Sequence, residues 1–222
     1  MNNTQLIVFD WDGTLMDSEG EILTCMRAAI RDLDLAPRSD DQLKNIIGLG
    51  LQEALRALYP QGRPEELIQL TARYRHHFLE SEREPSQLFA GAREMIEELH
   101  CAGHFLAVAT GKGRQGLNKV LQQTGLDEYF HTTRCADECH SKPHPQMLHE
   151  IMDYLGVETD AALMIGDTEY DLQMASNAGV KSLAVSYGVH ERQRLLDCKP
   201  LDCLDSIGDV HNWLKERSNL AA

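Results

Sequence analysis

Continuously apolar runs and amphipathic stripes alternate along most of this chain. The apolar runs are short and end abruptly in polar residues or glycine, as the buried strands of a parallel sheet do. Three clear runs span residues 6–9, 105–109 and 162–165, and a weaker run spans residues 182–185. We expect each run to be a strand whose carboxyl end leads into a loop.

Between these runs, apolar residues recur at the spacing of a helix and stop before a glycine. Such stripes cover residues 92–99, 117–121, 147–155 and 172–175. Strands and helices therefore alternate from about residue 90 onward. This alternation predicts an α/β fold with a Rossmann-like parallel sheet.

Residues 17–86 interrupt the alternation. Four helical stripes are expected there without any intervening strand pattern, at residues 22–33, 43–47, 51–59 and 64–78. We therefore expect an inserted all-helical cap domain at 17–86 and an α/β catalytic core made of residues 1–16 and 87–222. A joint between the two is expected near Pro85.

Composition and charge exclude several classes of partner. The 222 residues are 42% hydrophobic and 25% charged, which suits a globular protein with a sizeable core. A formal net charge of −14 repels polyanions, so no nucleic-acid partner is expected. We expect no secretion signal and no membrane partner, because charges interrupt every longer apolar region. Six scattered cysteines then indicate a reduced, cytoplasmic protein.

Acidic side chains follow two of the expected strands, at the sheet edge where ligands bind in open α/β folds. Asp10 and Asp12 share one side of an extended chain, and Gly13 permits a sharp turn after them. Asp167 and Asp171 lie on one face at the start of a helix. Converging carboxylates indicate a hard cation with oxygen ligands, Mg²⁺ before the others.

Four short motifs resemble those of the haloacid dehalogenase-like superfamily of phosphohydrolases, and they occur in the family's order. They are DWDGTL at 10–15, VATGK at 108–112, SKPHP at 141–145 and GDTEYD at 166–171. The resemblance is closest to the phosphoglycolate phosphatase-like branch, and the helical insert lies where the family has its small cap. It implies an Mg²⁺-dependent phosphatase of a small phosphomonoester, with phosphoglycolate as the first candidate.

The same resemblance implies catalytic roles for four residues. Asp10 would be the nucleophile that forms an aspartyl-phosphate, and Asp12 the general acid and then the general base. That role needs a protonated Asp12, which neighbouring carboxylates would favour. The Thr110 hydroxyl, the Gly111 amide and the Lys142 ammonium would bind phosphate oxygens, with Thr110 and Lys142 also counted as catalytic.

For the metal, the resemblance implies a set of acidic ligands. Mg²⁺ would bind the carboxylates of Asp10 and Asp167 and the main-chain carbonyl of Asp12. Asp171 would be a further ligand or would support the others.

Other functions remain open at this level. A phosphomutase of the β-phosphoglucomutase type shares all four motifs, but returns the phosphoryl group to a sugar. A non-catalytic binding or regulatory member is a second alternative, although every expected catalytic residue is present. A dehalogenase is disfavoured by the presence of Asp12, which that branch does not need.

The segment CADECHSKPH at residues 135–144 allows two further readings. Its cysteines and histidines could be zinc ligands, but the usual close cysteine pair is absent, so a loop with incidental thiols is favoured. Ser141 also stands where the family commonly has glycine or a basic residue, which would slightly alter how Lys142 is presented.

The expected cap would close over the site, exclude water during the first step and reopen for product. We expect the turn Gly48–Leu49–Gly50 and Lys44 to face the site, and Ser18 to be the N-cap of the first cap helix. Lys44 is the only lysine of the insert, so the Schiff-base chemistry of related phosphonate-cleaving enzymes stays open. The expected partner is a small-molecule phosphate ester, and the protein is expected to be a monomer or homodimer.

Overall fold

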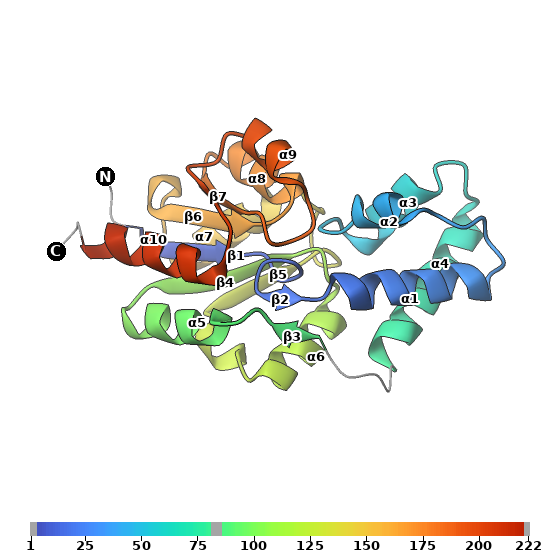
Figure 1. Ribbon diagram of the computed structural model, residues 1–222, viewed down its shortest axis with the longest axis horizontal. Coiled ribbons are helices and arrows are strands. Elements are labelled where there is room, and N and C mark those ends of the chain that lie inside the picture. The colour runs from blue at the N-terminus through green and yellow to red at the C-terminus, as the bar shows by residue number, and fades with distance from the viewer. Residues whose placement is uncertain (1–3, 81–85, 220–222) are drawn as a thin grey trace.

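A computed structural model describes residues 4–80 and 86–219 and contains a six-stranded, all-parallel sheet (Figure 1). The strand order is β5–β4–β1–β6–β7–β8. The strands are β1 (Leu6–Phe9), β4 (Phe105–Thr110), β5 (Thr132–Cys135), β6 (Ala162–Gly166), β7 (Lys181–Val185) and β8 (Cys203–Leu204). The predicted α/β fold is confirmed. The apolar pattern does not predict β5 and β8, because TTRC is mostly polar and CL is only two residues long.

Helices cover both faces of the sheet, as the continuously apolar strands require. Ile7 and Phe9 pack on the face covered by α5 (Ala92–Cys101), α6 (Arg114–Thr124) and α10 (Ile207–Asn219). Leu6 and Val8 pack on the opposite face, against α7 (Gln146–Leu155) and α8 (Glu169–Asn177). The sheet-containing part also has the short helix α9 (Arg192–Asp197) and 3₁₀ turns at Asp127–Tyr129 and Thr159–Ala161.

The first four helices lie together beyond one end of the sheet (Figure 1). They are α1 (Glu19–Asp32), α2 (Asp40–Lys44), α3 (Leu51–Leu58) and α4 (Pro64–Leu79). They share an apolar cluster of their own, which includes Met26, Leu55 and Leu70. The helix expected to reach residue 47 ends at Lys44, but Ile46 and Ile47 remain buried in the same cluster.

The chain leaves the sheet-containing part and returns to it at adjacent points. The antiparallel pair β2 (Met16–Asp17) and β3 (Gln87–Leu88) joins the two crossings. The expected boundary after residue 16 falls within β2, and the expected joint near Pro85 lies outside the described residues. The division into a core and a cap at these positions stays a prediction, supported by the separate apolar cluster of α1–α4.

The helices are short or amphipathic, and α4 has 16 residues. Within the described residues, no helix is both long enough and apolar enough to cross a membrane.

Candidate phosphate and metal site

The central strands bring the predicted motif residues to one edge of the sheet. Asp10 directly follows β1, Thr110 ends β4, and Asp167 directly follows β6. Strands β4 and β6 flank β1 on its two sides. Because parallel strands end at the same edge, the three polar side chains converge there, and each is 0–1% exposed.

Three carboxylates form a buried acidic cluster at this edge. Asp10, Asp167 and Asp171 each offer an oxygen within 4.8 Å of the others. Desolvation by burial raises the pKa of Asp10 well above its usual value, against the opposing charge of Lys142. Burial, assisted by the charge of Asp171, raises the pKa of Asp167 to about 7. The raised pKa values of Asp10 and Asp167 therefore favour their protonated forms unless a cation compensates their charge.

Lys142 supplies part of that compensation from the loop between β5 and α7. Its Nζ lies 2.8 Å from Asp10 Oδ1 and 2.5 Å from Asp171 Oδ1, and its side chain is 0% exposed. Burial alone would lower the pKa of this ammonium group, but the charges of Asp10 and Asp171 raise it above the usual range. The structure thus places Lys142 beside the predicted nucleophile as a charged group.

The hydrogen bonds of the cluster indicate which oxygens remain for a cation. Asp10 Oδ1 lies 2.8 Å from the Lys142 ammonium, and Asp10 Oδ2 has no hydrogen-bond donor among the described residues. Asp167 accepts hydrogen bonds from Thr14 Oγ1 at 2.9 Å and from the Val189 N–H at 2.8 Å. Buried carboxylate oxygens of this kind fit a hard cation such as Mg²⁺.

Asp171 is the more fully occupied member of the cluster. Its Oδ1 contacts Lys142, and its Oδ2 accepts hydrogen bonds from the N–H and the Oγ1 of Thr168 at 3.1 and 2.7 Å. These contacts favour a role for Asp171 in supporting the metal ligands rather than in binding the metal directly.

Gly13 is required by both its backbone and its surroundings. Its φ of +78° lies in the left-handed region. A Cβ at this position would lie 2.2 Å from Asp167 Oδ2. The loop after β1 can therefore pass close to Asp167 only without a side chain.

The contacts of Asp12 differ from those expected. Its Oδ1 lies 2.9 Å from Lys112 Nζ and accepts a hydrogen bond from Ser18 Oγ at 2.5 Å. A cation and a hydroxyl, rather than other carboxylates, are thus its contacts. Ser18 occupies the N-cap position of α1 as predicted but makes no capping hydrogen bond. The sequence reasoning missed the roles of both partners, although the lysine of the VATGK motif was a signal for one of them.

The turn between α2 and α3 contacts the motif residues, as predicted. A Cβ on Gly111 would lie 2.5 Å from the carbonyl oxygen of Leu49. The Gly50 N–H donates to Ser141 Oγ at 2.7 Å, so this departure from the family pattern ties the turn to the Lys142 loop. The prediction for Lys44 is wrong: its Nζ pairs with Glu19 at 2.7 Å, and its half-exposed side chain is not part of the cavity wall.

The cysteines near Lys142 do not resemble metal ligands. Burial raises the pKa of the Cys135 thiol to about 12 and that of the Cys139 thiol to about 11. Zinc binds thiolates, so these environments favour the reading of incidental, protonated thiols.

Magnesium is expected to raise the Tm of the protein more near pH 8 than near pH 5.5, because the ligands must be ionised. Without a divalent cation, the raised pKa of Asp167 means that its contribution to stability is present below about pH 4. This contribution is lost as the pH rises through about 7. Thermal unfolding with and without Mg²⁺ at the two pH values measures the effect. An equal Mg²⁺ shift at both pH values, or an undiminished shift in Asp167→Asn, would contradict the assignment.

Comparison with known proteins gives consistent matches over nearly the whole chain. The family model described as haloacid dehalogenase-like hydrolase matches residues 7–185. The chain is 32% identical over 222 residues to "Probable phosphatase IndB" of Dickeya dadantii, covering 96% of each chain. It is 29% identical over 218 residues to a phosphoglycolate phosphatase of Vibrio cholerae, covering 95% of this chain and 96% of that one.

Solved structures agree with these matches. A crystal structure described as "a predicted phosphoglycolate phosphatase" from Haemophilus somnus superposes with a TM-score of 0.84. That protein is 25% identical to this chain, and the alignment covers 96% of this chain and 99% of the other. The similarity therefore extends over the helices α1–α4 as well as the sheet.

Proposed function

The chain belongs to the haloacid dehalogenase-like hydrolase family, and we propose that it hydrolyses a small phosphomonoester with Mg²⁺ through an aspartyl-phosphate on Asp10. The observation that carries this proposal is the buried Asp10 carboxylate, which lies 2.8 Å from the buried Lys142 ammonium. Relatives named as phosphatases support the reaction class. Phosphoglycolate is the first ester to test, because curated relatives carry that name.

In the first step, an oxygen of Asp10 attacks the phosphorus, a bond from phosphorus to that oxygen forms, and the ester bond breaks. A phosphomonoester resists such attack because its negative charge repels the nucleophile. Lys142 offsets this charge from its position between Asp10 and Asp171. Mg²⁺ bound by Asp10, Asp167 and the Asp12 carbonyl would add further positive charge at the phosphate.

Residues at the end of β4 are suited to hold the transferred group. Thr110 Oγ1 accepts a hydrogen bond from the Lys112 N–H at 3.2 Å and donates to no described residue, which leaves its proton for a phosphate oxygen. The Gly111 N–H is a second donor in our proposal, and Gly111 lines the cavity beside Asp10 and Asp12.

Asp12 moves the proton in both steps. It gives a proton to the leaving alcohol oxygen and later takes one from the water that attacks the aspartyl-phosphate. That water breaks the bond from phosphorus to the Asp10 oxygen and releases inorganic phosphate. Ser18 and Lys112 hold the Asp12 side chain in place, and its carboxylate takes up a proton from solvent before the first step.

The sharpest test of the reaction class is a screen of phosphate esters with and without Mg²⁺. Release of free phosphate supports a phosphatase, whereas an isomerised sugar phosphate without net release would indicate a mutase. Turnover that is independent of a divalent cation would contradict the proposed metal.

We also propose that the protein works in the cytoplasm. No disulfide links its six cysteines, although all of them lie in the described part of the chain. This agrees with a reducing compartment.

Lys112→Met is expected to lower kcat by about tenfold, because Asp12 loses the cation that positions it. Lys119→Met is the matched control. The ammonium groups of Lys112 and Lys119 lie 4.3 and 5.2 Å from the centre of the Phe78 ring. Of the two, only Lys112 contacts Asp12. Steady-state kinetics on one ester compares the variants, and equal losses in both would assign the effect to Phe78 packing instead.

A further inference from the structure

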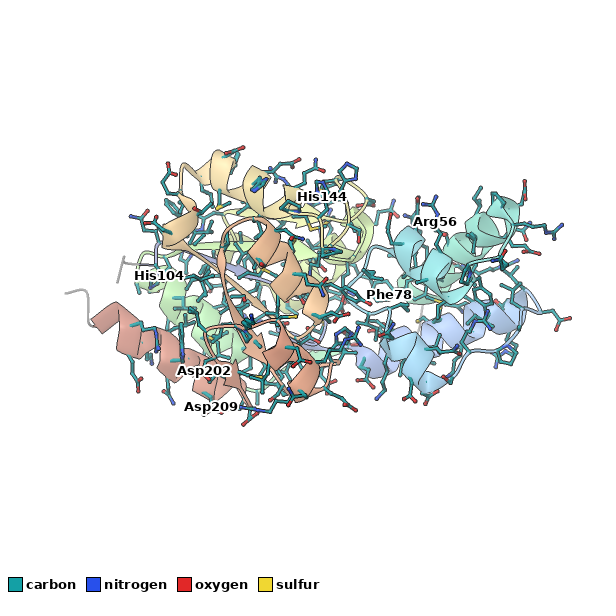
Figure 2. All side chains as sticks on the ribbon, turned by 90° about the horizontal axis from the view of Figure 1, so that it is seen from above. Arg56, Phe78, His104, His144, Asp202 and Asp209 are labelled. Atoms are coloured by element: carbon teal, nitrogen blue, oxygen red, sulfur yellow. The ribbon has the colours of Figure 1, made fainter. Side chains whose placement is uncertain are left out.

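The site opens into a cavity that is large for the phosphate group alone. Its volume is about 510 Å³, and it lies between the helices α1–α4 and the sheet-containing part. Asp10, Asp12 and Gly111 line its inner end, where our proposal places the phosphate. Phe78 lies at the junction of the two parts (Figure 2). The rest of the volume is therefore available to the alcohol part of the ester.

The side of this remaining space formed by residues 22–79 is mainly apolar, whereas polar residues such as Gln115, His140 and Ser141 line the opposite side. Helices α1, α3 and α4 and the turn before α3 contribute to this side, through Met26, Ile47, Leu49, Leu51, Tyr74 and Phe78. Leu49, Leu51 and Tyr74 are only partly buried, so they can contact a bound molecule. The rings of Tyr74 and Phe78 are nearly parallel, with centroids 6.3 Å apart along α4, and both residues line the wall. A neutral apolar group would lose water favourably against such a surface.

The charges of the wall do not favour a second anionic group on the substrate. Among the described lining residues outside the acidic cluster, Glu53 and Asp137 add further negative charge. Lys112 is engaged by Asp12 and lies over the Phe78 ring, so the exposed Arg75 and the imidazole of His140 are the other basic groups of the described lining. A carboxylate or second phosphate would thus lose hydration next to apolar and acidic neighbours.

We propose that the natural substrate is a phosphomonoester of a neutral, predominantly apolar alcohol about the size of an aromatic ring. This inference rests on the proposed phosphatase function and specifies its substrate class. It disfavours phosphoglycolate and also sugar bisphosphates, because each carries a second anionic group. The cap wall, rather than a cation, then selects the ester.

Three esters of primary alcohols test the preference, because their leaving groups have similar chemistry. They are benzyl phosphate, ethyl phosphate and phosphoglycolate. We expect kcat/KM to be at least about tenfold higher for benzyl phosphate than for ethyl phosphate, and lowest for phosphoglycolate. A preference for phosphoglycolate over benzyl phosphate would overturn the inference. If Arg75→Met then removed that preference, Arg75 would be the cation that binds the second anionic group.

A variant of the wall tests the same claim from the protein's side. Leu51→Asn is expected to reduce the benzyl-to-ethyl ratio of kcat/KM by about tenfold. Ile68→Asn makes a similar change at a position of α4 that is 69% exposed, and should leave the ratio unchanged. Thermal unfolding checks that both variants fold. An unchanged ratio in a folded Leu51→Asn protein would overturn the inference.

Binding measurements separate this inference from the proposed catalysis. The phosphonate analogues of the three esters are 2-phenylethylphosphonate, propylphosphonate and 3-phosphonopropionate. Each has a CH₂ group in place of the ester oxygen, so the proposed reaction cannot cleave it. Calorimetric titration of the Asp10→Asn protein with each, in the presence of Mg²⁺, should give the tightest binding for 2-phenylethylphosphonate, by about tenfold. Equal or tighter binding of 3-phosphonopropionate would overturn the inference. Absence of phosphate release from every ester would instead contradict the proposed function.

Discussion

Asp10→Asn is expected to abolish catalysis, with a fall in kcat of about a thousandfold or more. Asparagine keeps the size of the side chain but cannot supply the carboxylate oxygen that attacks phosphorus in the proposed mechanism. The neighbouring Lys142 and the buried position would remain, so the loss would be chemical rather than structural. Phosphate release from the best ester measures the change, and mass spectrometry of the acid-quenched parent protein should show one added phosphoryl group that the variant lacks.

The stability of Asp10→Asn provides an internal check. Burial raises the pKa of Asp10 well above its unfolded value, so the ionised carboxylate destabilises the folded state at neutral pH. Removing this charge should leave the Tm unchanged or higher. Asp17→Asn is the matched control, since Asp17 is an exposed carboxylate of the same segment. Turnover of Asp10→Asn at the rate of the Asp17→Asn control would show that another group is the nucleophile.

Lys142→Met is expected to reduce both stability and activity. The ammonium group lies fully buried between Asp10 and Asp171, and its removal leaves two desolvated carboxylates without their partner. Breaking a buried ion pair in this way costs about 3–5 kcal/mol of unfolding free energy. Urea unfolding measures this loss, and kcat should fall by at least about a hundredfold because the phosphate charge is no longer offset.

A double variant distinguishes the electrostatic cause from poor packing of methionine. In the Lys142→Met protein, adding Asp171→Asn removes one of the two uncompensated charges. Part of the lost stability should return, whereas activity should not. If the second change lowers stability further, the destabilisation comes from packing or from the Thr168 hydrogen bonds to Asp171, and the proposed charge balance is wrong.

The sequence alone determined the elements with strong local signals. Apolar runs such as residues 6–9 carry the information for a doubly covered strand in their own side chains, and they form β1, β4, β6 and β7. The helical stripes and their terminal glycines are equally local. The edge strand β5 lacks this signal because Thr132, Thr133 and Arg134 are only partly buried, and its place in the sheet comes from pairing with β4.

The candidate site shows the same distinction more sharply. The motifs identify Asp10, Thr110, Lys142 and Asp167, and the order β4–β1–β6 accounts for the convergence of the residues at the strand ends. Local spacing could not show that Ser18 turns from its helix towards Asp12, or that Lys44 pairs with Glu19 away from the cavity.

Residue type and spacing determined which groups this protein can bring to a reaction, because strand burial and helix periodicity depend on near neighbours in the chain. Only the tertiary structure decided which charge meets which. Lys112 contacts Asp12 across 100 positions of sequence, and the turn at Gly48–Gly50 reaches Gly111 and Ser141. Such contacts arise when loops at the strand ends meet one another and the turn between α2 and α3, so no short segment contains the information that specifies them.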